Sequence, residues 1–195
     1  MKSLLASLLL LVWATPSLGL PVVVVDMDPS TPGIQDTLAA ALGITVAVDV
    51  VVLGVEAGAP LNAFEFDLDF SSAILTPVSV VGGGFLLDPT VVAQLVLGAV
   101  SVEFAEATVG SGSVTGDGVL ATVTFDTVGL GTSPLDLNDV ILSAPFGVPI
   151  ATAGVTDGEI VVPEPSTLVL VGVGLTAAVA TRRRARGQEA TLNSA

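Results

Sequence analysis

Three observations on the sequence of 195 residues predict an all-β fold, in the form of an antiparallel β-sandwich. Apolar and polar residues alternate with a period of two, most sharply over residues 64–70, so successive side chains face opposite sides of a strand. Turns rich in Gly and Pro recur at short intervals, and no long segment has the 3.6-residue period of an amphipathic helix. Short strands at this spacing are typical of sandwiches and barrels.

Nine segments carry the strand pattern, and together they predict one domain over residues 20–162. The stretch from Phe85 to Val92 predicts a short helical or irregular crossing. Gly110 to Ser113 predicts a surface loop, because it is too short to separate two domains and strand patterns flank it. The predicted strands are residues 22–26, 44–53, 64–70, 74–81, 92–96, 100–105, 119–126, 135–142 and 158–162.

Composition excludes several classes of function. The sequence has no Cys and no His, which removes disulfides, thiol nucleophiles and the usual general base at neutral pH. No Lys or Arg occurs from Ala14 to Thr181, while seventeen acids lie between Asp26 and Glu159. Nucleic-acid binding needs clustered cations, so it is not expected. The acids favour simple solubility, with tolerance or use of divalent cations or high salt as the alternative.

The N-terminus has the three parts of a secretory signal peptide. Lys2 supplies the positive charge, Leu4 to Ala14 is a short apolar region, and small residues stand at Ser17 and Gly19. We expect residues 1–19 to be removed by cleavage after Gly19. A retained N-terminal anchor is the alternative.

The body resembles a cohesin-like domain in the order and spacing of its segments. This resemblance covers most of residues 22–162 and implies a jelly-roll sandwich of about nine strands that binds proteins or lies beside polysaccharide. Because no dockerin segment is visible, we do not extend the dockerin binding of cellulosomal cohesins to this protein. The segments that carry the resemblance are Val48-Asp-Val-Val-Val52, Leu61-Asn-Ala-Phe-Glu-Phe-Asp-Leu-Asp-Phe70, Gly116-Asp-Gly-Val-Leu-Ala-Thr-Val-Thr-Phe125, Leu135-Asp-Leu137 and Gly158-Glu-Ile-Val-Val162.

Two groups of acids could carry chemistry. Glu65, Asp67 and Asp69 share one face of a strand, with successive side chains about 7 Å apart along it. Paired carboxylates are the catalytic groups of glycoside hydrolysis. A solvated outer face explains them more simply, and no Ser has a His to activate it, so we expect no enzyme. Oxygen-rich turns offer weak Ca²⁺ candidates without the EF-hand spacing, and turn capping is the simpler interpretation. These candidates are Asp26, Asp28, Asp136, Asn138 and Asp139.

The C-terminal segment has three parts. Pro163, Glu164 and Pro165 form an extended, exposed motif, because proline ends strand pairing. Residues 167–181 supply an apolar segment of about 22 Å as a helix, short against a hydrocarbon core of about 30 Å. Cations then mark the cytoplasmic side by the positive-inside rule. They are Arg182, Arg183, Arg184 and Arg186.

These parts, in this order over residues 162–186, resemble a PEP-CTERM sorting signal. The resemblance implies recognition by an exosortase, a membrane cysteine protease of Gram-negative bacteria, with processing near Pro163–Pro165 and an association with exopolysaccharide. Residues 187–195 depart from the pattern, and we expect them to form a short cytosolic tail.

The expected protein is therefore exported through the inner membrane, held there by its tail and released to the envelope or extracellular matrix after processing. Its sandwich is expected to bind another surface protein or exopolysaccharide without catalysis or a cofactor. A carbohydrate-binding module is the first alternative, and it predicts an exposed Phe platform or a calcium site. A surface hydrolase that uses Glu65, Asp67 or Asp69 is the second.

Overall fold

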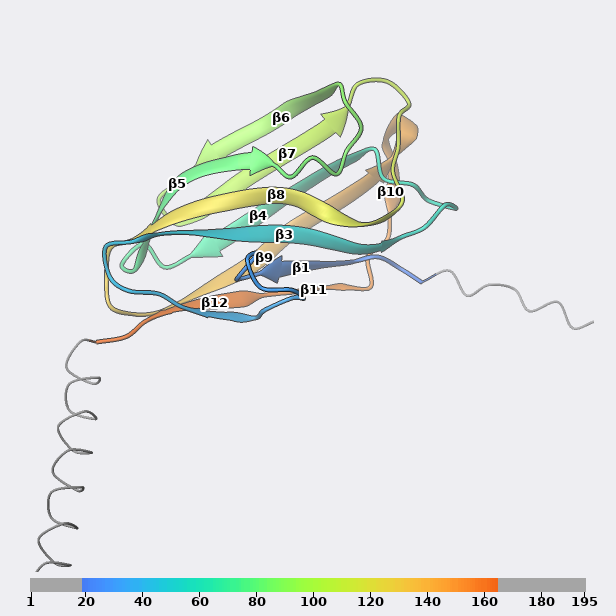
Figure 1. The fold of residues 1–195 in the computed structure, drawn as a ribbon. Helices are drawn as coiled ribbons and strands as arrows, with labels where there is room; N and C mark the ends of the chain where they lie inside the picture. The colour runs from blue at the N-terminus through green and yellow to red at the C-terminus, as the bar shows by residue number, and fades with distance from the viewer. Residues whose placement is uncertain (1–18, 165–195) are drawn as a thin grey trace, which may run out of the picture.

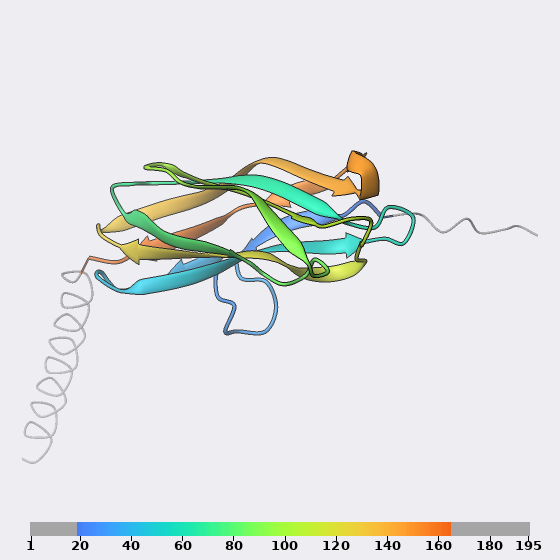
Figure 2. The same cartoon turned by 90° about the horizontal axis from the view of Figure 1, so that it is seen from above.

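The computed structural model describes residues 19–164, which form two β-sheets packed face to face (Figures 1 and 2). One sheet has the order β11-β1-β3-β8-β5, and the other has the order β2-β12-β9-β4-β7-β6, with β10 added beside β9. We call them the first and the second sheet. The predicted signal peptide before Gly19, Pro165, the apolar segment 167–181, the arginines and the tail 187–195 lie outside the described residues.

Twelve strands and one short 3₁₀ turn make up the described chain. Each of the nine predicted segments forms a strand, and the all-β sandwich is confirmed. The elements are β1 (Val22–Asp26), β2 (Thr37–Ala39), β3 (Thr45–Val55), β4 (Ala63–Phe70), β5 (Leu75–Gly82), β6 (Thr90–Leu97), β7 (Ser101–Thr108), β8 (Gly116–Thr127), β9 (Gly131–Ala144), η1 (Pro145–Gly147), β10 (Val148–Ile150), β11 (Gly154–Thr156) and β12 (Gly158–Val162).

Three strands of three residues each were not predicted, because their own sequences carry too short a pattern. β2 pairs in parallel with β12, β11 pairs in parallel with β1, and β10 pairs with β9. The two parallel pairs differ from the predicted antiparallel arrangement, and both join segments from opposite ends of the chain at a sheet edge. The crossing after Phe85 is irregular and contains no helix, and β6 already begins at Thr90.

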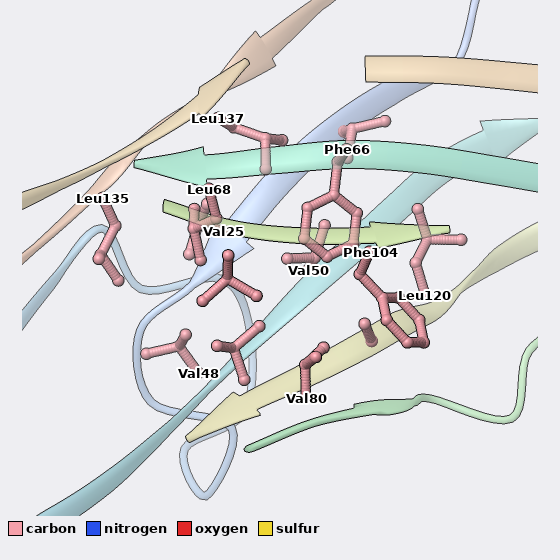
Figure 3. Close-up of a cluster of buried hydrophobic side chains, with 14 of the residues drawn as sticks. Val25, Val48, Val50, Phe66, Leu68, Val80, Phe104, Leu120, Leu135 and Leu137 are labelled. Atoms are coloured by element: carbon pink, nitrogen blue, oxygen red, sulfur yellow. The ribbon is translucent and has the colours of Figure 1, made fainter. Parts of the chain in front are cut away.

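The core lies between the sheets and follows the alternation in the sequence. In β4 the residues Phe64, Phe66, Leu68 and Phe70 are buried, while the residues between them are half-buried on the outer face. Figure 3 shows Phe66, Leu68, Leu135 and Leu137 of the second sheet pointing toward Val25, Val48 and Val50 of the first. Period-two patterning thus places one apolar face of each sheet against the other.

Five of the seven Phe side chains lie in this core. Phe64, Phe66 and Phe104 form a cluster on the second sheet, with ring centroids 6.0 to 6.2 Å apart. Phe70 meets Phe125 of the first sheet edge to face, with centroids 5.2 Å apart. Such aromatic pairs add to the free energy gained by burying apolar area, and the Phe70–Phe125 pair contributes this energy to the contact between the two sheets.

Candidate binding face

The acids predicted on one face of a strand lie on the outer face of the second sheet, away from the core. Glu65, Asp67 and Asp69 alternate with the buried Phe66 and Leu68 of β4, and all three are half-buried. Because β4 lies between β9 and β7, this row runs through the interior of the sheet rather than along an edge. The row is the centre of what we call the acidic face.

Neighbouring strands bring further acids to the row. Glu103 of β7 lies opposite Asp67, and Asp136 of β9 lies opposite Asp69. Asn138, also on β9, lies opposite Asp67 and donates a hydrogen bond of 3.0 Å from Nδ2 to Asp69 Oδ2. The acidic face therefore combines residues from β4, β7 and β9, and its Asp69 and Asn138 are 69 residues apart in the chain.

A bulge in β9 adds one more carboxylate. The pairing of β4 with β9 shifts register between Glu65 and Asp67, and Asp139 takes the extra position with a φ of 47°. Asp is one of the few residues that tolerate this left-handed backbone conformation. Its charge is close enough to affect Asp67, so the bulge increases the negative charge at the centre of the face.

Electrostatics at Asp67 reflect this crowding. Partial burial raises the pKa of the Asp67 carboxyl above its usual value, and the charges of Glu103, Asp139, Asp69 and Glu65 raise that pKa further. Residues 19–164 contain no Lys, Arg or His, so no basic side chain of the described domain offsets this repulsion. The face therefore favours a partner that brings positive charge.

An apolar hollow adjoins the acids on the same outer face. Small side chains from three strands leave this hollow beside Glu65, and Ile141, which is 51% exposed, forms one wall. On the other flank of the face, Gln94 of β6 donates a 2.5 Å hydrogen bond from Nε2 to Glu103 Oε2. The small residues that line the hollow are Ala63, Ala93, Ala105 and Ala107.

The predicted calcium candidates lie in two separate places. Asp26 Oδ1 accepts hydrogen bonds from the backbone N–H groups of Asp28 and Gln35, and Asp28 Oδ1 accepts a 2.5 Å bond from the Ser30 hydroxyl. These bonds close the turn after β1, and the hydrogen bonds from the Ser30 and Thr31 hydroxyls lower the pKa of Asp28. The other candidates belong to the acidic face. Across residues 19–164, no three acidic side chains converge into a group that could hold a metal ion.

One aromatic side chain is fully accessible. Phe146 of η1 is 94% exposed, whereas Phe85 is half-buried and the other five are in the core. Phe146 has a φ of 67° and follows β9 at the end of the sandwich where the described chain begins. It is the single exposed ring that the carbohydrate alternative could use within the described domain.

The predicted sorting motif follows the last strand without a linker. Val162 is 1% exposed and pairs with Gly131, and the next two residues, Pro163 and Glu164, are exposed. The helix η1 of three residues is far too short to cross a bilayer, and no other helix occurs in residues 19–164.

The described domain is a sandwich of two sheets, and the outer face of its second sheet is accessible and acidic. The family model of the cohesin domain matches residues 33–162, about two thirds of the chain, so the protein belongs to the cohesin family. Cohesin domains are non-catalytic binding modules. The model of the PEP-CTERM protein-sorting motif matches residues 161–184, which marks an exported protein processed at a membrane.

Solved structures agree with this fold. The third cohesin of ScaC from Acetivibrio cellulolyticus, solved with the ScaB dockerin, is 16% identical with a TM-score of 0.59 and 74% of this chain and 100% of that chain covered. CaCohA2 from Clostridium acetobutylicum is 18% identical, with a TM-score of 0.58 and coverage of 74% and 92%. A non-cellulosomal cohesin from the archaeon Archaeoglobus fulgidus is 16% identical, with a TM-score of 0.56 and coverage of 73% and 92%. The comparison with curated proteins gives no match.

Sequence reasoning found the row on β4 but missed its neighbours. Glu103, Gln94 and Ile141 belong to the same face, yet nothing in their local sequence says that β7 and β9 flank β4 or that β6 lies beyond β7. The alternation Ser-Val-Glu-Phe over residues 101–104 does place Glu103 on an outer face. Only the order of strands could identify which face that is.

Proposed function

We propose that this protein is an exported, non-catalytic adhesion module whose acidic face binds a basic surface on another envelope or matrix protein. The concentration of acids on one sheet carries the proposal. Seven acids of the second sheet face outward there, against four on the strands of the first sheet, which are Asp26, Asp49, Asp117 and Asp126. The seven are Glu65, Asp67, Asp69, Glu103, Asp136, Asp139 and Glu159.

The test uses two charge reversals of equal size. Asp67→Lys with Glu103→Lys changes the acidic face, and Asp49→Lys with Asp126→Lys changes the other outer face by the same net charge. The measurement is salt-sensitive binding of the purified full-length chain to isolated extracellular matrix from the producing cells. We expect loss of binding only for the first pair. At physiological salt, exposed charges on opposite faces of the domain are screened from each other, so each pair affects only its own face. Equal losses from both pairs would refute a specific face.

We also propose that an exosortase processes the chain at Pro163–Pro165 in the inner membrane of a Gram-negative bacterium. The match to the sorting motif supports this, together with the exposed position of Pro163 and Glu164 directly after β12. In the matching experiment these three residues are replaced by alanine in a chain tagged within the body. We expect a larger product that stays in the membrane fraction, whereas unchanged size and release would contradict processing at this motif.

Carbohydrate binding is the second candidate, and one observation favours it. Phe146 presents nearly its whole ring to solvent, as a sugar-stacking residue would. Phe146→Ala should then abolish retention on immobilised exopolysaccharide and leave protein binding intact. Retention equal to that of the unchanged protein would remove this candidate.

A further inference from the structure

The two ends of the sandwich differ in charge and in the chain segments that leave them. In Figure 1 the described chain begins at one end with Gly19 and leaves the other end after β12. Four connecting segments lie at the same end of the sandwich as this exit: residues 40–44, 71–74, 98–100 and 128–130. None of them contains a charged residue, although seventeen acids lie between Asp26 and Glu159. The loops at the opposite end include Glu56 and Asp88.

Aliphatic side chains project from this uncharged end. Leu42 and Ile44 precede β3, Val100 lies in the turn between β6 and β7, and Val128 and Leu130 lie between β8 and β9. Their exposed fractions run from 42% for Leu130 to 58% for Val100. We call these five residues the apolar end. Five exposed aliphatic residues on connecting segments without charges form a surface suited to an apolar partner, and the nearby acids are Asp126 at the end of β8 and Glu164 after β12.

Backbone hydrogen bonds hold the apolar end in place. Thr127 is 2% exposed, and its hydroxyl donates to the carbonyl of Ala41 at 2.8 Å and accepts from the N–H of Ile44 at 3.0 Å. The N–H of Val128 donates to the carbonyl of Ile74 at 2.8 Å. Polar groups paired in this way lose little when water is removed from around them, which lowers the cost of contact with an apolar medium.

The length of chain after β12 connects this end to a membrane. Val162 is fixed in the sheet by pairing with Gly131, and the apolar segment starts five residues later at Thr167. A fully extended chain covers at most about 18 Å over five residues. The headgroup layer itself takes about 5 to 8 Å of that length. If the apolar segment enters the bilayer, the sandwich must lie within about 13 Å of the headgroups, with its exit end toward them.

We propose that the apolar end rests on the lipid surface and orients the domain while the tail is still in the membrane. This inference rests on the proposed membrane step of sorting. Lipid is favoured over a second copy, because the tether brings the bilayer to this end. It also turns connecting segments without charged residues toward the anionic headgroups and keeps the loops with Glu56 and Asp88 away from them. Glu164, directly after β12, is the acid that stays on the membrane side. The acidic face, on the side of the domain, remains accessible for its partner.

Single cysteines give a direct test, because the sequence has no Cys of its own. Full-length Leu130→Cys and Leu42→Cys chains are labelled with a polarity-sensitive fluorophore and reconstituted into vesicles of phosphatidylethanolamine and phosphatidylglycerol that contain nitroxide lipids. Phe146→Cys is the matched control at the opposite end. We expect quenching of about twofold or more at positions 130 and 42, and none at position 146. Adding Val128→Asp to the Leu42→Cys chain should lower quenching at position 42 while the chain still floats with the vesicles.

The outcomes separate this inference from the proposed function. A chain that floats with the vesicles but shows equal quenching at both ends, or none, overturns only the lipid contact. A chain that does not float overturns both the membrane step and the lipid contact. Two results together would assign the apolar end to a protein partner and overturn the lipid assignment. The Leu42→Cys chain would show no quenching at position 42, and Val128→Asp would abolish processing by exosortase.

Discussion

Removing one charge from the acidic face should stabilise the domain. In the change Asp67→Asn, the amide keeps the size of the side chain and removes repulsion from four neighbouring carboxylates. Those neighbours are Glu103, Asp139, Asp69 and Glu65. Directly opposed residues have Cβ atoms about 5 Å apart, and alternate residues on a strand lie about 7 Å apart.

The expected magnitude follows from these separations. Two unit charges about 6 to 7 Å apart repel by about 0.6 kcal/mol in water, and 0.15 M salt roughly halves that energy. Four such neighbours sum to about 1 kcal/mol, a value already discounted for the solvent exposure of this face. The free energy of unfolding of Asp67→Asn should therefore exceed that of the parent by about 1 kcal/mol at neutral pH.

Urea unfolding at two salt concentrations measures this difference. At 1 M NaCl the screening length falls to about 3 Å, so the part of the gain that comes from repulsion should nearly vanish, while the part that comes from burial of the charge remains. The matched control is Asp36→Asn, which removes an exposed charge outside the acidic face and should change stability by less than about 0.5 kcal/mol. A destabilised Asp67→Asn variant, or a gain that is as large at 1 M NaCl as at low salt, would refute the electrostatic reasoning.

The same substitution predicts a pH dependence with a definite sign. The pKa of Asp67 is raised in the folded protein, so the folded state binds its proton more tightly than the unfolded state does. The contribution of Asp67 to the free energy of unfolding therefore falls as pH rises from the ordinary Asp value, about 3.9, through the raised value. The stability difference between Asp67→Asn and the parent should disappear below about pH 4, where both side chains are neutral. A difference that is constant across this range would contradict the assignment.

Three further substitutions test the packing, each by urea unfolding. Phe104→Ala should cost about 3 to 5 kcal/mol, because it removes a ring 1% exposed from the aromatic cluster. Thr127→Val should cost about 1 to 3 kcal/mol, since the isosteric side chain leaves the carbonyl of Ala41 and the N–H of Ile44 without the hydroxyl. Gly129→Ala should cost about 1 to 3 kcal/mol, because its Cβ would overlap the carbonyl oxygen of Ala73.

A surface control accompanies these three changes. Val81→Ala on β5 removes a side chain that is 56% exposed, and its effect should stay below about 1 kcal/mol. A Phe104→Ala variant no less stable than Val81→Ala would contradict the placement of the ring in the core. Thr127→Val with unchanged stability would likewise contradict the hydrogen bonds that hold the loop before β3.

Much of the fold could be predicted from local sequence. The alternation Phe-Glu-Phe-Asp-Leu-Asp-Phe over residues 64–70 determines which side chains of β4 are buried, because a strand has only two faces and the apolar face must leave water. The pattern was too short for β2 and β11, which form only where β12 and β1 offer a free edge. Local propensity cannot report such an edge, since its partner lies more than 100 residues away in the sequence.

By itself, the sequence determined the sandwich, the family resemblance, the absence of cations from the body and the order of sorting motif, apolar segment and arginines. These features follow from residue type and spacing alone. Only the tertiary structure decided that Glu103 and Asp139 join the row on β4, because strand order and a bulge in β9 bring them together. It also placed Leu42, Val128 and Leu130 at the same end of the sandwich as the exit of β12. Which distant segments share a face or an end depends on long-range pairing between strands, and no local pattern encodes that arrangement.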